Sequence, residues 1–142
     1  VHHRDGFEGL PGILPPTPRR GLVLIDPSYE IKTDYTKTAK AVKQAHKRWA
    51  TGIYAVWYPI LVDDKSRFLL DELEQSGIRR ILVAEISREA GADETFGMIG
   101  SGMLLVNPPY QLDEQLQEIL PELAQAMLGP DAKASVRWLV GE

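Results

Sequence analysis

The chain of 142 residues contains no cysteine, which excludes both disulfide bonds and thiolate metal sites. It also lacks any stretch approaching the ~20 consecutive apolar residues that a membrane span needs. No signal peptide is visible, because no apolar run follows the basic residues near the start. We therefore expect a cytoplasmic protein with no membrane partner.

An excess of positive charge is also missing, since 16 Lys and Arg stand against 20 Asp and Glu for a net charge of −4. This balance argues against a protein that coats nucleic acid, but it allows an enzyme that touches nucleic acid over a small patch. One basic cluster stands out, preceded by Lys32: Lys37, Lys40, Lys43, Lys47 and Arg48. We expect a solvated helix face there, and a phosphate-contacting face is the alternative.

Histidine is scarce as well, with only His2, His3 and His46. No third ligand lies at a spacing that suits a metal ion beside them. We expect surface or hydrogen-bonded histidines and no metal site.

The first half of the chain alternates between strand and helix patterns. A Pro- and Gly-rich opening, through Arg20, predicts an irregular connector. The unbroken apolar run at residues 21–25 predicts a strand buried on both faces. A helix is expected over residues 34–50, with Asp34 as a possible cap, and a strand over residues 53–58.

The second half continues with a helix over residues 65–75, in which Phe68, Leu69 and Leu73 point inward and Gly77 lies just past the end. The further expected elements are a strand over 78–86, a loop over 87–99, a strand over 103–106, an amphipathic helix over 112–128 that Pro121 kinks or splits, and a strand over 135–140.

This order predicts an α/β fold in which a mostly parallel sheet ends in an antiparallel hairpin. Alternating strands and helices favour parallel strands joined by right-handed crossovers. The third and fourth strands have no helix between them, so they form an antiparallel pair. The arrangement is that of the second half of a Rossmann-like methyltransferase.

The most informative motif is Asp26-Pro27-Ser28-Tyr29, directly after the first strand, where ligands of open α/β sheets bind. A carboxylate and a proline carbonyl at this point can accept both hydrogens of an adenine amino group, which frees its lone pair for attack. The carboxylate also stabilises the positive charge that develops on the nitrogen. The aromatic ring can stack on the base. A plain strand-ending turn is the alternative reading.

A rival tetrapeptide, Asn107-Pro108-Pro109-Tyr110, looks more like a known motif of amino-directed methyltransferases, (D/N/S)-P-P-(Y/F/W), than Asp26-Pro27-Ser28-Tyr29 does. It follows a strand of the expected hairpin and not a parallel strand. Two prolines there more simply end a strand and start the next helix. We therefore assign the chemistry to Asp26-Pro27-Ser28-Tyr29.

The chain resembles the RlmJ family of 23S ribosomal RNA adenine-N6 methyltransferases over nearly its whole length. The motif itself looks like the (D/N/S)-P-P-(Y/F/W) pattern of amino-directed methyltransferases, with Ser28 in place of the usual second proline. The resemblance is carried by residues 19–35 (RRGLVLIDPSYEIKTDY), 50–59 (ATGIYAVWYP), 76–79 (SGIR), 101–103 (SGM) and 107–109 (NPP).

The resemblance implies methyl transfer from S-adenosyl-L-methionine to an adenine of 23S ribosomal RNA. By position, Asp26 and Pro27 match the catalytic residues, and Asp26 also lies close to the cofactor methyl. Asp5 and Gly6 match the acidic-Gly pair that helps to hold the cofactor's adenine, and Tyr29 matches the base-stacking aromatic.

Further substrate contacts are expected around the same crevice. Lys32 follows the motif and lines the substrate entrance, with a solvated loop as the alternative. Trp57 and Tyr58, at what we expect to be another strand end, form a wall for the flipped base or pack in the core.

The family's glycine-containing cofactor loop and ribose-binding acid have no counterpart here. We therefore expect residues 1–142 to be the C-terminal part of a single methyltransferase domain, inactive alone and monomeric. The alternatives are a DNA adenine-N6 methyltransferase and a non-catalytic nucleic-acid-binding module that keeps the fold.

Overall fold

The computed structural model describes residues 2–142 and contains five strands and four helices in that part of the chain. In chain order these are α1 (Gly6–Ile13), β1 (Leu22–Ile25), α2 (Thr33–Arg48), β2 (Ile53–Leu61), α3 (Arg67–Glu74), β3 (Ile81–Ser87), β4 (Met98–Val106), α4 (Leu112–Leu128) and β5 (Lys133–Val140). All the strands belong to one sheet in the order β1-β2-β4-β3-β5. The α/β class expected from the sequence is confirmed.

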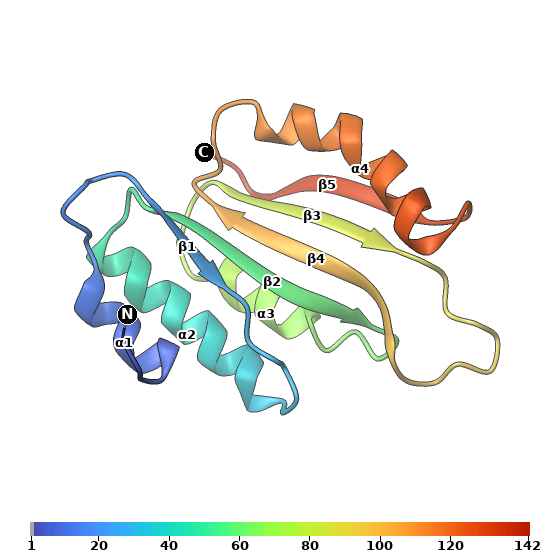
Figure 1. Ribbon diagram of the computed structural model, residues 1–142, viewed down its shortest axis with the longest axis horizontal. Coiled ribbons are helices and arrows are strands. Elements are labelled where there is room, and N and C mark those ends of the chain that lie inside the picture. Colours follow the sequence, from blue (N-terminus) through green and yellow to red (C-terminus); the bar gives the residue numbers. More distant parts are fainter. Residues whose placement is uncertain (1) are drawn as a thin grey trace.

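The sheet is mixed, because one antiparallel strand lies among strands that run in the same direction. β1 and β2 are parallel, whereas β4 is antiparallel to both of its neighbours, β2 and β3. The predicted antiparallel pairing of β3 with β4 is therefore confirmed. Because β4 inserts between β2 and β3, these two strands still run in the same direction as β1 (Figure 1). Among the described residues the one parallel ladder is β1 with β2, and β5 adds an antiparallel edge strand, so the sheet is mixed, with the other pairs antiparallel.

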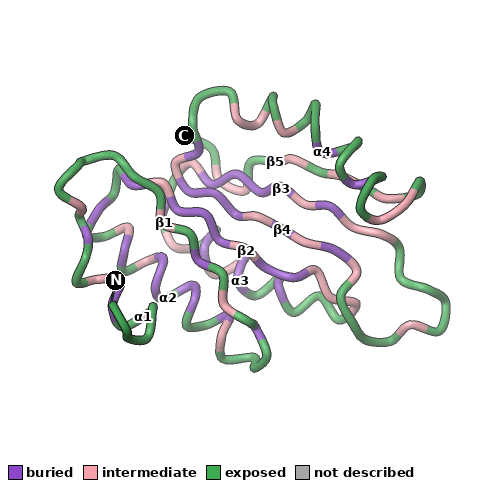
Figure 2. The backbone as a smooth tube through the Cα atoms, viewed as in Figure 1, coloured by how far each residue is buried: buried purple, intermediate pink, exposed green. Residues whose placement is uncertain are grey.

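Helices cover the two faces of the sheet unequally. α1, α2 and α3 pack on one face, where the largest apolar cluster includes Val42, Tyr54, Leu69 and Val83. α4 covers the β3–β5 end of the other face, through residues such as Leu120 and Ala124. Figure 2 shows the buried residues concentrated along the central strands, with the loops at both ends of the sheet exposed.

β1 differs from its prediction because only one of its faces is covered in this chain. Leu22 and Leu24 are 60% and 61% exposed, whereas Ile25 is buried. Alternate residues of a strand point to opposite faces. The two leucines therefore lie on the face that no helix covers at this end of the sheet.

Other local features differ from what the sequence predicts. The opening segment contains α1 where we expected an irregular connector. Phe68 is exposed, and Leu70 is buried together with Leu69 and Leu73. Asp34 is not the N-cap of α2, which is Lys32. Of the two outcomes predicted for Pro121, a split of α4 is excluded because the helix continues from Leu112 to Leu128, and a kink stays a prediction.

Candidate active site

Asp26 lies at the edge of the sheet where β1, β2 and β3 end. The ladder between β1 and β2 stops at the pair Ile25 and Val56, so Asp26 and Pro27 lie just beyond it. The Asp26 side chain is exposed and the Pro27 side chain is half-buried. The carboxylate therefore faces an opening at the carboxyl edge, where ligands of such sheets bind.

A cavity of about 290 Å³ opens beside this carboxylate. Asp5 and Gly6 line it together with Asp26 and Pro27, although the two pairs are about twenty residues apart in the chain. The remaining wall is apolar and comes from α1 and β1: Phe7, Leu10, Val23, Leu24 and Ile25. Two carboxylates on an apolar wall suit a flat heterocycle that carries polar groups at its ends.

Asp5 reaches the cavity because it starts α1. It is the N-cap of this helix, and its Oδ1 accepts a hydrogen bond of 3.1 Å from the backbone N–H of Glu8. The helix then presents Phe7 and Leu10 to the cavity. Sequence reasoning missed these two residues. The signal was present as an Asp followed by Glu three residues later, which is typical of a helix start.

Tyr29 anchors the loop that carries Asp26. Its backbone φ is +53°, a conformation that bulky residues adopt only when their surroundings hold them there. The Tyr29 hydroxyl donates a hydrogen bond of 2.8 Å to the Trp57 carbonyl, and its ring centroid lies 4.5 Å from that of Tyr35. Burial raises the pKa of the Tyr29 phenol, which keeps it a neutral donor.

This packing differs from the expected stacking role of Tyr29. The residue is 7% exposed, so its ring offers no open face to a base in this conformation. The geometry therefore gives Tyr29 a supporting role, in which it fixes the turn between Ser28 and α2.

Trp57 and Tyr58 lie in the middle of β2, not at a strand end, and they point to opposite faces of the sheet. Trp57 is half-buried, its ring centroid is 6.0 Å from that of Tyr29, and its Nε1 donates to the Ser101 hydroxyl at 3.4 Å. It is therefore close to the motif.

Of the two alternatives for Tyr58, the structure favours packing in the core. Tyr58 is 0% exposed and its hydroxyl donates a 2.7 Å hydrogen bond to Oε1 of Glu85. Its ring crosses β4 at Gly102, where a Cβ atom would lie 2.2 Å from the ring. Tyr58 is a core residue.

Lys32 and the basic face of α2 are divided between solvent and structural contacts. Lys32 is exposed in the loop that follows the motif. Lys43 forms an ion pair of 2.7 Å with Glu72, and the Arg48 guanidinium donates to the Leu14 carbonyl. Lys37 and Lys40 are exposed beside Asp5 and Phe7, along a second cavity on α1 and α2.

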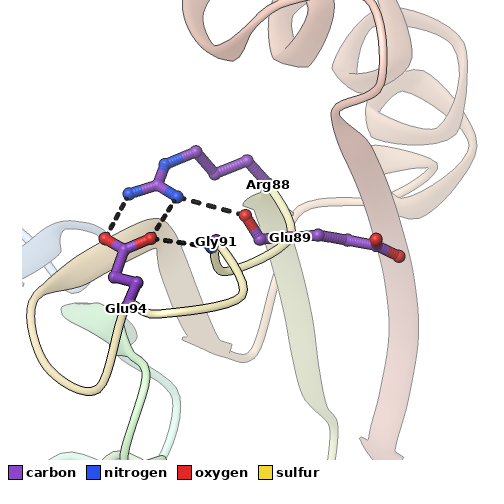
Figure 3. Close-up of polar contacts among 4 residues, drawn as sticks. All are labelled: Arg88, Glu89, Gly91 and Glu94. Atoms are coloured by element: carbon purple, nitrogen blue, oxygen red, sulfur yellow. Dashed lines mark hydrogen bonds and ion pairs between the residues drawn. The ribbon is translucent and has the colours of Figure 1, made fainter.

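The loop between β3 and β4 lies at the same carboxyl edge and is held by an ion pair (Figure 3). Both terminal nitrogens of Arg88 donate to the Glu94 carboxylate at 2.7 Å, and the backbone N–H of Gly91 donates to the same group at 3.0 Å. These contacts lower the pKa of Glu94 to about 2, with the Arg88 hydrogen bonds as the main cause. The loop therefore has a defined shape.

The rival tetrapeptide lies at the opposite edge of the sheet, after β4. The Asn107 amide donates to the Ala50 and Gly52 carbonyls at 2.8 and 2.9 Å. These bonds tie the end of β4 to the start of β2. Asn107 is thus committed to holding two strands together at the edge away from the cavity.

Within residues 2–142 no group of three or more His, Cys, Asp or Glu side chains could hold a metal ion. In the same part of the chain, no helix has the length and apolar character to cross a membrane.

The strand order, the inserted antiparallel strand and the acidic motif after β1 define a Rossmann-like methyltransferase fold. The chain belongs to the family described as "Ribosomal RNA large subunit methyltransferase D, RlmJ", whose family model matches residues 1–140.

Two curated relatives carry the name "Ribosomal RNA large subunit methyltransferase J". The one from Escherichia coli strain K12 is 42% identical over 143 residues, which span 100% of this chain and 51% of that protein. The one from Haemophilus influenzae is 43% identical over 140 residues, with 97% of this chain and 49% of that protein covered. The chain thus spans about half the length of the curated relatives it matches.

A solved structure supports the same fold. It is the crystal structure of protein LPL1258 from Legionella pneumophila str. Philadelphia 1, of the family DUF519, with a TM-score of 0.86 and 31% sequence identity. The match covers 96% of this chain and 50% of that one.

Proposed function

We propose that residues 1–142 form the C-terminal part of a methyltransferase domain that transfers a methyl group from S-adenosyl-L-methionine to the N6 amino group of an adenine in 23S ribosomal RNA. The main support is the cavity at the carboxyl edge of the sheet, where Asp26 and Pro27 meet Asp5 and Gly6. Membership of the RlmJ family supports ribosomal RNA as the substrate class.

The cavity has the chemistry that an adenosine moiety requires. Phe7, Leu10 and Val23 supply apolar surface for a flat base, and Asp5 supplies an acceptor for its amino group. When bound, S-adenosyl-L-methionine supplies an electrophilic methyl group on a positively charged sulfur. Asp26 at the far end of the same wall places a negative charge beside that region.

Asp26 and Pro27 bind and activate the target amino group. The exposed Asp26 carboxylate accepts one hydrogen of the target amino group, and the Pro27 carbonyl, outside the strand ladder, accepts the other. The carboxylate stabilises the positive charge that grows on the nitrogen and then takes the proton. Because this charge exists only on the way to product, the interaction lowers the barrier more than it tightens binding.

The neighbouring aromatic residues position this pair. Tyr29 fixes the turn through the Trp57 carbonyl, which holds Asp26 at the cavity. The half-buried Trp57 ring forms the wall beside the motif, and the exposed Lys32 contacts RNA phosphate near the target. The target adenine leaves its stack to reach Asp26, as is general for enzymes that modify a base.

The test uses the full-length protein, radiolabelled S-adenosyl-L-methionine and two substrates, protein-free 23S ribosomal RNA and duplex DNA. We expect label in the RNA, and digestion to nucleosides should give N6-methyladenosine. Label in DNA alone would assign the chemistry to the other substrate. Calorimetry of the full-length protein with S-adenosyl-L-methionine distinguishes an enzyme from a non-catalytic module. Such a module would not bind the cofactor and would not transfer a methyl group.

A further inference from the structure

A third cavity, of about 380 Å³, opens at the amino edge of the sheet, on the side of the molecule away from Asp26. It is formed by the segment before β1, the turn before β2, the residue before β3 and the residue after β4 (Figure 1). Its lining residues are Arg19, Arg20, Gly21, Ala50, Thr51, Ile53, Arg80 and Asn107.

The charge of this cavity is of one sign. Three arginines line it and no acidic side chain does, in a chain whose net charge is −4. Arg19 and Arg20 are exposed. Arg80 forms an ion pair with Glu142, whose carboxylate lies 3.4 Å from Nη1 and is 85% exposed, so this partner is weak and screened by solvent.

Within residues 2–142, Arg80 also has a donor atom without a hydrogen-bond partner. Its Nε is buried and forms no hydrogen bond in the described part of the chain. Buried polar groups are nearly always hydrogen-bonded, so an unsatisfied donor points to a missing partner. A guanidinium fork presents its donors in the geometry that a phosphate group accepts.

Hydrogen bonds fix the Arg80 side of the cavity. The Arg80 backbone has φ +55°, donates to the Gly141 carbonyl at 2.9 Å and accepts from the Asn107 N–H at 3.0 Å. The Asn107 amide in turn holds the Ala50 and Gly52 carbonyls. The Arg80 side chain therefore starts from a fixed point, which lowers the entropy lost on binding an anion.

We propose that this arginine cavity, formed by Arg19, Arg20 and Arg80, binds a phosphate group of the RNA backbone. The inference rests on the proposed function. Along β1 the cavity lies about 17 Å from Asp26, at about 3.3 Å per residue. A contact at this distance engages a different part of the RNA from the target adenine, and it fixes the register of the RNA without reading its sequence.

The test compares the full-length protein with its Arg20→Gln/Arg80→Gln double variant, using protein-free 23S ribosomal RNA between 50 and 200 mM salt. We expect RNA binding to weaken by about tenfold and the slope of log K against log salt to fall by about one. Arg79→Gln is the matched control, because this exposed arginine lies on the same turn outside the cavity. It should change binding by less than about twofold.

Two further arms keep the outcome clear. If the double glutamine variant fails to fold, Arg20→Lys/Arg80→Lys replaces it, because this variant keeps the charge and loses the guanidinium fork, and its RNA binding should weaken by more than about twofold. Inorganic pyrophosphate, titrated by calorimetry, tests a free phosphate ligand. Loss of pyrophosphate binding with RNA binding unchanged would contradict the assignment to the RNA backbone and would show a site for a free phosphate ligand instead.

Several results would overturn the proposal. If both ligands bind the double variant as they bind wild type, the arginine cavity is not a phosphate site. An equal loss with Arg79→Gln would show general charge attraction instead. Failure of wild type to bind or methylate the RNA would count against the proposed function, and the pyrophosphate titration would still test the cavity.

Discussion

At the carboxyl edge of the sheet Asp26-Pro27-Ser28-Tyr29 follows β1, and at the amino edge Asn107-Pro108-Pro109-Tyr110 follows β4. The two tetrapeptides have similar letters and opposite surroundings. The Asp26 carboxylate is exposed beside a cavity and Tyr29 is 7% exposed, whereas the Asn107 amide is bonded to two carbonyls and Tyr110 is 87% exposed.

The difference shows that strand direction decides what such a tetrapeptide can do. A parallel strand delivers the residue after it to the edge where crevices form. The inserted antiparallel β4 delivers Asn107 to the other edge, among the starts of β2 and β3. The prolines of the second tetrapeptide separate β4 from α4, and the Asn107 side-chain amide bonds to the start of β2.

The largest expected effect is that of Asp26→Ala, which removes both the acceptor oxygens and the charge of the side chain. We expect methyl transfer by the full-length enzyme to fall by roughly 10²–10⁴-fold, since the growing positive charge loses its partner. Thermal unfolding should be nearly unchanged because the side chain is exposed. Single-turnover kinetics measures the first effect and calorimetry the second.

Asn107→Ala supplies the opposite pattern. Loss of two hydrogen bonds, each worth about 0.5–1.5 kcal/mol, should lower the midpoint of thermal unfolding by several degrees. The rate per folded molecule should change little. A large loss of rate with Asn107→Ala, together with an active Asp26→Ala enzyme, would exchange the roles of the two edges.

Tyr29→Phe tests whether the motif loop needs its anchor. The change removes the hydrogen bond to the Trp57 carbonyl and should cost about 1–3 kcal/mol of folding free energy. It should also lower the transfer rate by about tenfold, because Asp26 is less firmly placed.

The matched control is Tyr54→Phe, since the Tyr54 hydroxyl also donates at 2.8 Å to a backbone carbonyl, that of Trp49, in the core. It should lower stability to a similar extent and leave the rate unchanged. Equal effects of the two variants on the rate would mean that Tyr29 acts through general stability only.

The sequence predicts the carboxyl edge of the sheet well because the signals for it are local. The apolar run of β1 and the abrupt Asp26-Pro27 place the carboxylate without knowledge of the rest of the fold. The amphipathic pattern of α4 likewise predicts its full extent. α1 was missed because Gly6, Gly9, Pro11 and Gly12 outweigh its start signal, although packing against α2 stabilises it.

What the sequence could not predict depends on contacts between distant residues. Tyr29 is buried because Tyr35 and Trp57 lie beside it, and Tyr58 because Gly102 leaves room for its ring on the neighbouring strand. The arginine cavity joins residues 19–20 with residue 80 through the insertion of β4. None of these pairs has a signature in local periodicity.

A smaller effect is expected from Ser28→Pro, which restores the second proline of the methyltransferase pattern. Ser28 is exposed, and a proline there restricts the unfolded chain, so we expect a gain of about 0.4–1 kcal/mol in folding free energy. The transfer rate should be kept or rise by about twofold. Ser28→Ala controls for loss of the hydroxyl, and a severe drop in rate with Ser28→Pro would show that the loop needs its present backbone.

The smallest effect concerns the loop between β3 and β4. Its Glu94 carboxyl should titrate near pH 2 by carbon-detected NMR, against an ordinary value of 4.5, and Arg88→Gln should return it towards that value. Because the folded pKa is lowered, the ion pair stabilises the loop above about pH 4.5 and its contribution is lost as the pH falls towards 2. A Glu94 pKa that ignores Arg88→Gln would contradict the contact.

The most direct test of the central claim is a crystal structure of the full-length protein with S-adenosyl-L-homocysteine bound. We predict that the ligand occupies the cavity between Asp5, Gly6 and Asp26, with its sulfur towards the Asp26 carboxylate. A ligand bound at the amino edge beside Asn107, or a cavity at Asp26 that stays closed to the ligand, would contradict the account.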